Sequence, residues 1–115
     1  FMPETCDIEH IFPQGSDYSE WKISNKAKKE LIDNQQRYAL GNLTLLKPRD
    51  NGKIGCASFD KKYTKVYGKD RNYKKNNQLN TYEFSSPNPQ NAVTKRGRDI
   101  AGTIHENLLL NLKRE

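Results

Sequence analysis

Two short stretches decide the fold, Asp7-Ile8-Glu9-His10-Ile11-Phe12-Pro13-Gln14 and, further along the chain, Gly41-Asn42-Leu43-Thr44-Leu45-Leu46. Apolar and polar residues alternate through residues 5–12, which predicts a short strand that ends at Pro13. Residues 38–46 form the most apolar segment of the chain, and we expect them to pair with the first strand. A glycine weakens a strand, so Gly41 is expected at a bend or bulge.

Helical patterns surround these strands. Residues 24–31 are expected to form a short helix capped by Ser24 or Asn25. A second helix is predicted from residue 54 to 68, with lysines on most of its polar faces. A final helix after Pro89 is expected to cover the core, because apolar residues recur there with helical spacing, at Val93, Gly97, Ile100, Ala101, Ile104, Leu108 and Leu112. Residues 47–52 and 69–91 are predicted to be loops, the second with one strand-like piece at 79–84.

Length and composition narrow the class of protein. The chain has 115 residues, of which 33% are hydrophobic and 30% are charged, and its mean hydropathy is −1.04. These values predict a single small domain and exclude a membrane-spanning segment. The two cysteines lie far apart without a CxxC pair, so no structural zinc site is expected and both thiols are expected to be buried. No signal peptide precedes the first strand, which favours the cytoplasm.

The net charge of +6 is concentrated in the middle of the chain. Between Lys47 and Lys75 there are ten basic residues against three acidic ones, whereas the first twenty-one residues contain no Lys or Arg. An acidic segment beside a basic one suits a divalent cation next to a surface that holds phosphate groups. The alternative is that these charges are only scattered over a solvated surface.

Taken in order, the motifs resemble those of HNH endonucleases, which are also called ββα-metal or His-Me finger nucleases. They resemble in particular the C-terminal nuclease domain of GmrSD-type modification-dependent restriction proteins and their relatives in phage defence. That pattern reads EHIxPQ, GNLTLL, a downstream Asn, then FxxK and Tyr, and residues 7–67 match it. Residues 93–101, with Arg96, resemble its closing helix. The resemblance implies an α+β fold, a small ββα-metal finger with a helix inserted between its strands and a C-terminal covering helix.

Phosphodiester hydrolysis needs an activated water and stabilisation of negative charge, and these needs suggest roles for the motif residues. An imidazole can accept a proton at neutral pH, so His10 is expected to be the general base. The resemblance implies that Asn42 orients His10, and that Glu9 and Asn51 bind one Mg²⁺ or Mn²⁺ ion, with Asp7 as an auxiliary ligand. Adjacent residues of a strand point to opposite faces, so Glu9 and His10 can share a site only if the strand twists or ends there.

The basic residues of the middle segment are the expected contacts for phosphate groups. The alternative is a solvated helix face without a binding role. The residues assigned to phosphate contact are Lys53, Lys61, Lys62, Lys65 and Lys69.

Together these features predict a metal-dependent endonuclease that cuts or nicks double-stranded DNA with little sequence specificity, as the effector of a restriction or antiviral defence system. Residues 1–115 are expected to be one domain, with the core motif in 5–68 and a loop and helix in 69–115, excised from a longer protein. The resemblance implies an upstream partner domain that hydrolyses NTP and senses DNA. Two alternatives remain open: a catalytically idle nucleic-acid-binding module, and a ribonuclease of the same fold.

Overall fold

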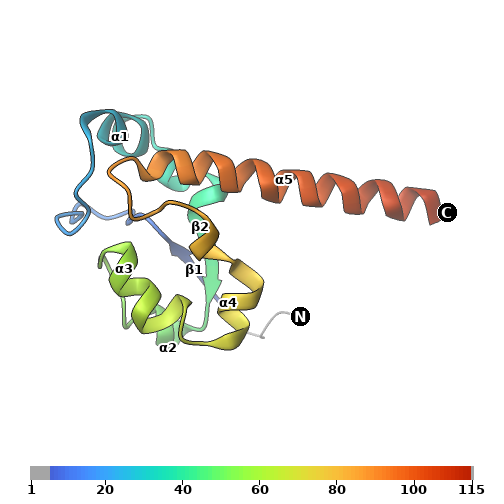
Figure 1. Ribbon diagram of the computed structural model, residues 1–115, viewed down its shortest axis with the longest axis horizontal. Helices are drawn as coiled ribbons and strands as arrows, with labels where there is room; N and C mark the ends of the chain where they lie inside the picture. The colour runs from blue at the N-terminus through green and yellow to red at the C-terminus, as the bar shows by residue number, and fades with distance from the viewer. Residues whose placement is uncertain (1–5, 115) are drawn as a thin grey trace.

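The computed structural model describes residues 6–114, except for the side chains of residues 75–77 and 114. Its elements are short apart from the last helix (Figure 1). Labels with η denote 3-10 or π-helical segments. In chain order the elements are β1 (Asp7–His10), α1 (Asn25–Lys28), η1 (Lys29–Asp33), η2 (Gln36–Tyr38), η3 (Leu40–Asn42), β2 (Leu43–Leu46), α2 (Pro48–Asn51), α3 (Phe59–Lys62), η4 (Tyr63–Tyr67), α4 (Arg71–Asn77), η5 (Leu79–Thr81) and α5 (Pro89–Arg114).

The two strands form an antiparallel sheet in which Asp7 lies opposite Leu46 and His10 lies opposite Leu43. Since side chains alternate along a strand, Asp7 and Glu9 share one face of the sheet while Ile8 and His10 share the other. α3 and η4 cover the first face. Hydrogen bonds from Lys62 and Tyr67, which belong to these two segments, to Glu9 show this packing. This arrangement confirms the predicted α+β fold, with helical segments between two paired strands.

The hydrophobic core lies between the inner face of the sheet, α1, the α3–η4 segment and the first half of α5. Two groups of aromatic side chains contribute much of its volume. Phe12 packs edge-on against Trp21 with ring centroids 5.1 Å apart, and Phe59 stacks on Phe84 at 5.4 Å. Apolar burial of this kind is the main force that stabilises so small a domain.

The predicted helix at residues 24–31 is confirmed. α1 begins at Asn25, and the Ser24 side chain caps it by accepting a hydrogen bond from the Ala27 backbone N–H. The helix continues through the π-helical η1 to Asp33. Leu31 anchors it in the core.

Several expected element boundaries are wrong. Residues 38–42 are not strand, because 3-10 turns run to Asn42 and β2 begins only at Leu43. The expected loop at 47–52 contains α2, with Pro48 in its first turn, where a missing N–H costs nothing. Residues 54–58 precede the second predicted helix, which starts at Phe59.

The segment 69–91 also differs from the long loop that the sequence predicts. It contains α4, whose N-terminus is capped by the Asp70 carboxylate; this accepts hydrogen bonds from the backbone N–H groups of Asn72 and Tyr73. Residues 79–84 are not a strand, since η5 occupies Leu79–Thr81.

α5 covers the core only with its first half. Val93 is buried, whereas Ile104, Leu108 and Leu112 are 51%, 58% and 66% exposed, so the expectation that these three cover the core is wrong. Figure 1 shows why, because the second half of α5 projects away from the rest of the chain. Among the described residues, no helix is both long and apolar enough to span a membrane.

Candidate functional site

Asn42 fixes the chain immediately after His10. Its side chain is fully buried. Its Oδ1 accepts from the Phe12 N–H at 2.8 Å, and its Nδ2 donates to the carbonyl oxygens of Phe12 at 2.9 Å and Arg37 at 2.6 Å. The Asn42 carbonyl also accepts from the Ile11 N–H at 2.8 Å. Asn42 therefore holds the backbone of residues 11 and 12. The hydrogen bonds of its side chain go to Phe12 and Arg37 and not to the His10 imidazole.

Lys62 holds the same segment from the other side. Its side chain is fully buried, and its Nζ donates to Glu9 Oε2 at 3.0 Å, to the His10 carbonyl at 3.0 Å and to the Ile11 carbonyl at 2.8 Å. The Tyr67 hydroxyl donates to the same Glu9 oxygen at 2.6 Å. Burial lowers the pKa of Lys62, opposed by the nearby Glu9 carboxylate, and burial raises the pKa of Tyr67, with Glu9 adding to the effect.

The burial of Lys62 corrects one assignment. Because its ammonium is enclosed by protein, Lys62 cannot contact phosphate as the sequence suggested. A signal for this position exists in the sequence: Lys62 lies three residues after Phe59 and four before Val66, which places it on the buried face of the helix.

Arg96 is the third buried anchor. It is 6% exposed, and its Nη1 donates to the carbonyl oxygens of Gly41 at 2.9 Å and Leu43 at 2.7 Å, on either side of Asn42. α5 can approach this closely because residue 41 is glycine, as a Cβ there would overlap the Val93 carbonyl oxygen. Sequence reasoning placed Arg96 on the closing helix but gave it no role.

His10 lies half-buried on the outer face of the sheet. The ring of Tyr38 meets the imidazole edge-on, with centroids 5.7 Å apart. Burial lowers the pKa of His10, and the positive charges of Lys62 and Arg37 act in the same direction, while Glu9 opposes them. The imidazole is therefore neutral at pH 7 and able to accept a proton.

Asp7 and Asn51 meet at the end of the sheet where β1 begins and β2 ends. Asn51 is the last residue of α2, and its Nδ2 donates to Asp7 Oδ2 at 3.3 Å. Both side chains are partly exposed. The structure thus brings together two of the three residues expected to hold a metal ion, while Glu9 points into the core.

Comparison with known proteins identifies the family of this chain. A family model described as the C-terminal domain of GmrSD restriction endonucleases matches residues 2–102. The chain belongs to this family. No curated protein and no solved structure matches the chain. Membership in the GmrSD C-terminal family confirms the resemblance seen in the sequence motifs and supports a restriction-type nuclease.

A divalent ion fits only part of the ligand set that the resemblance implies for this GmrSD C-terminal domain. Asp7 and Asn51 offer hard oxygen atoms at a site that water can reach, as Mg²⁺ prefers. Glu9 does not fit, because the Lys62 ammonium already neutralises its carboxylate and would repel a cation. Among the described side chains, no group of three His, Cys, Asp or Glu residues could hold a metal.

Cys6 and Cys56 are free thiols, and both are half-buried, whereas the sequence led us to expect buried thiols.

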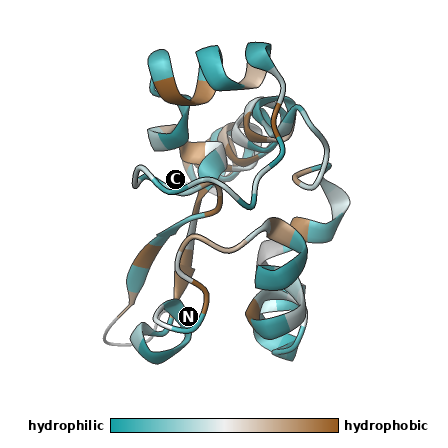
Figure 2. Cartoon of the chain, turned by 90° about the vertical axis from the view of Figure 1, so that its left-hand side faces the viewer, coloured by the Kyte–Doolittle hydropathy of each residue, from teal (hydrophilic) through white to brown (hydrophobic). Residues whose placement is uncertain are grey.

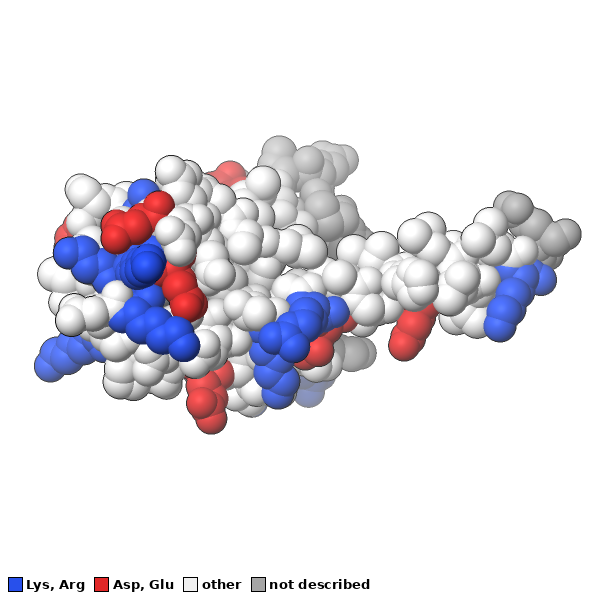
Figure 3. All heavy atoms as spheres, turned by 90° about the horizontal axis from the view of Figure 1, so that it is seen from above, with Lys and Arg blue, Asp and Glu red and all other residues white. Residues whose placement is uncertain are grey.

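The remaining lysines assigned to phosphate contact are exposed, as a phosphate-binding role requires. Lys53 pairs with Asp50 at 3.3 Å, and Lys61 pairs with Glu20 at 2.7 Å. Lys65 and Lys69 lie on η4 and just after it. Figure 3 shows a different face, the side of α1 and α5 at the top of Figure 1, where basic side chains lie beside acidic ones.

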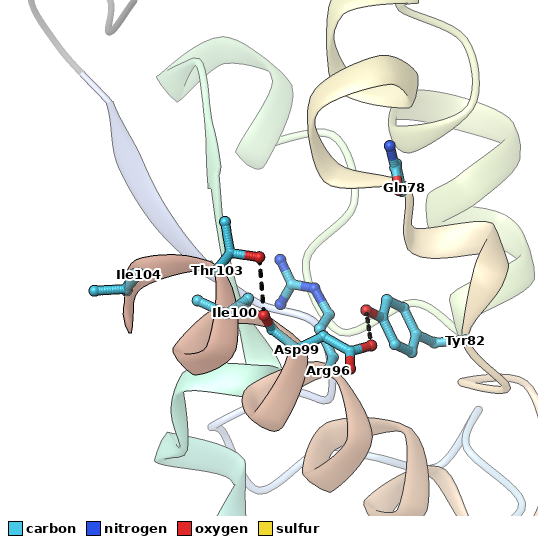
Figure 4. A pocket seen from close by; sticks show the side chains of 7 residues that line it. All are labelled: Gln78, Tyr82, Arg96, Asp99, Ile100, Thr103 and Ile104. Carbon is cyan, nitrogen blue, oxygen red and sulfur yellow. Dashed lines mark hydrogen bonds between the residues drawn. The ribbon is translucent and has the colours of Figure 1, made fainter. Parts of the chain in front are cut away.

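A pocket of about 530 Å³ opens between α5 and the η5 region (Figure 4). Its polar side chains include Arg96 and Asp99, and the Asp99 carboxylate accepts a hydrogen bond from the Tyr82 hydroxyl at 2.7 Å. None of the residues that the sequence assigned to the site lines this pocket. Since the charges of Arg96 and Asp99 offset each other, it offers no concentrated positive charge for a phosphate group.

Proposed function

We propose that this domain is a divalent-metal-dependent endonuclease that hydrolyses DNA phosphodiester bonds with little sequence selectivity of its own. Membership in the GmrSD C-terminal family supports a restriction nuclease. The observation that carries the finer assignment is that two buried side chains, Asn42 and Lys62, hold the backbone of residues 10–12. A third buried side chain, Arg96, holds the backbone on either side of Asn42. Buried Lys and Arg side chains are rare in proteins. Their presence beside Asn42 supports a fold built to fix the position of this histidine.

In this proposal His10 is the general base. Its neutral imidazole accepts a proton from water, the water oxygen attacks phosphorus, and the bond to the 3′ oxygen breaks. The 3′ oxygen leaves with the electron pair of that bond and takes a proton from solvent. The products are a 5′-phosphate and a 3′-hydroxyl. Asn42 and Lys62 act on the backbone of residues 10–12, which limits the movement of the imidazole during proton transfer.

Asp7 and Asn51 are the residues that would hold Mg²⁺ or Mn²⁺. The bound ion would supply positive charge to stabilise the additional negative charge of the transition state. His10 and Asp7 lie three positions apart on opposite faces of β1. The proposal therefore requires the substrate strand to contact His10 from one face and Asp7 from the other.

Cleavage of a supercoiled plasmid tests the proposal. The wild-type domain should nick or cut the plasmid with Mg²⁺ or Mn²⁺ and should be inactive with a chelator. His10→Ala, Asp7→Ala and Asn51→Ala should each lower the rate at least about a hundredfold. His105→Ala is the matched control, since this second histidine is exposed on α5 and should leave the rate unchanged. Equal rates for wild type and His10→Ala would refute the assignment of the base.

Parallel assays separate the alternatives. A catalytically idle binding module would hold DNA with a strong salt dependence and yield no product with any divalent ion. A ribonuclease would cut RNA and leave DNA intact. The choice of where to cut is assigned in this proposal to a partner domain that hydrolyses NTP and senses DNA in the cytoplasm, where a defence nuclease meets foreign DNA.

A further inference from the structure

The outer face of the sheet exposes large apolar side chains beside His10. Ile8 and Leu45 are opposite each other across the two strands and are 59% and 37% exposed. Figure 2 shows helices on one side of the strands and open space on the other. A solvated sheet face normally carries polar residues, so an exposed cross-strand apolar pair points to a binding surface.

This surface is continuous with the proposed site. His10 belongs to the same face as Ile8, because the two residues are separated by one position in β1. Tyr38 extends the surface, since this residue is 45% exposed and its ring meets the imidazole edge-on. The guanidinium of Arg37 lies over the Tyr38 ring, 5.3 Å from its centroid. We call Ile8, Leu45 and Tyr38 the apolar face.

We infer that the apolar face binds the sugar and base of the substrate strand next to the bond that is cut. This inference rests on the proposed function. Apolar side chains cannot hold phosphate groups, but they fit the apolar surfaces of deoxyribose and of bases, and an exposed aromatic ring can stack on a base. A protein seated on this face would cover His10 and keep the substrate away from the base, which favours nucleic acid as the occupant.

Two properties follow from the chemistry of such contacts. Phosphate contacts release counterions and depend steeply on salt, whereas apolar contacts do not. The apolar face should therefore contribute affinity without changing the slope of log K against log salt. It should also favour DNA over RNA, because a ribose 2′-hydroxyl pressed against Ile8 or Leu45 loses water without gaining a hydrogen-bond partner.

Fluorescence anisotropy with a short labelled DNA duplex tests the inference, with a chelator present to prevent cleavage. The double variant Ile8→Thr and Leu45→Thr places β-branched residues, which strands favour, at both positions and removes apolar surface. It should bind DNA about tenfold more weakly than wild type. Its salt slope and its unfolding midpoint, followed by Trp21 fluorescence, should not change. Leu112→Gln is the control, because it removes an exposed leucine far along α5 and should bind as wild type does.

Further arms of the experiment make the outcome decisive. Tyr38→Ala should weaken binding more than Tyr38→Phe, which keeps a ring to stack. With a matched RNA duplex, the double variant should lose less affinity than it loses with DNA. Unchanged DNA affinity in the double variant, or a lower salt slope like that expected of Lys61→Met, overturns the inference. If the wild-type domain neither binds nor cuts DNA, the proposed function itself fails, which is a different result.

Discussion

Replacing Lys62 with methionine should destabilise the domain by about 3–5 kcal/mol. Methionine has a similar length and fills the space, so the loss comes from the charge and its hydrogen bonds. Without the ammonium, the Tyr67 hydroxyl is the only partner that the described residues leave to the buried Glu9 carboxylate, and the carbonyl groups of His10 and Ile11 lose the Lys62 donor. Domains of this size have total stabilities of roughly 5–15 kcal/mol, so the effect is large.

A second substitution separates the charge from the packing. Glu9→Gln removes the negative charge but keeps an oxygen that accepts from Tyr67. In the double variant Glu9→Gln and Lys62→Met, no buried charge is left unpaired at this position. We therefore expect the second change to recover roughly 1–3 kcal/mol of the loss caused by Lys62→Met.

Urea unfolding measures both effects. Trp21, the single tryptophan of the chain, is buried against Phe12 and reports unfolding by its fluorescence. Lys65→Met is the control, since this exposed lysine on the adjacent turn should change stability by no more than about 0.5 kcal/mol. A loss below about 1 kcal/mol for Lys62→Met, or no recovery in the double variant, would refute the reasoning. If Lys62→Met cannot be purified, a folded double variant measures the same coupling.

Three further outcomes follow from the structure. Gly41→Ala should destabilise the domain by about 3 kcal/mol in thermal unfolding, because its methyl group would overlap the Val93 carbonyl oxygen. Arg96→Met should cost about 2 kcal/mol through two lost hydrogen bonds, whereas Arg98→Met, at an exposed neighbouring position, should cost little. Cleavage should fall as pH drops and His10 becomes protonated; because burial lowers the pKa of His10, the half-maximal rate should lie below pH 6.5. A midpoint above that value would contradict the burial argument.

Local patterns allowed much of the fold to be predicted. The capping Ser24 led to a helix that the structure confirms. The strands expected over residues 5–12 and 38–46 are confirmed only in part, as Asp7–His10 and Leu43–Leu46, and residue 5 lies outside the described residues. α2 and α4 were missed because they are short and lack an apolar stripe, so that their stability depends on caps and on neighbours. The second half of α5 was wrongly expected to cover the core, for the opposite reason. Its stripe has helical spacing, but periodicity says nothing about what lies against it.

The candidate site could likewise be predicted from the sequence only in part. Three spaced motifs were enough to indicate His10, Asn42 and the nuclease family, because the motifs follow one another along the chain in the order of the family pattern. The sequence also contained Lys62 and Arg96, but their importance depends on burial. A lysine in a basic segment is exposed far more often than buried, and only the packing of α3 against β1 shows that this one is enclosed.

The sequence by itself determined that His10 and Asn42 belong to two short segments that pair, that positive charge is concentrated in residues 47–75, and that the chain resembles a restriction nuclease. Tertiary structure decided which of two adjacent ionisable residues faces the core. Strand alternation sends Glu9 inward to Lys62 and leaves His10 on the outer face beside exposed apolar side chains. The physical reason is that a carboxylate can be buried only where a partner is already in place, and that partner lies fifty-three residues away in the chain.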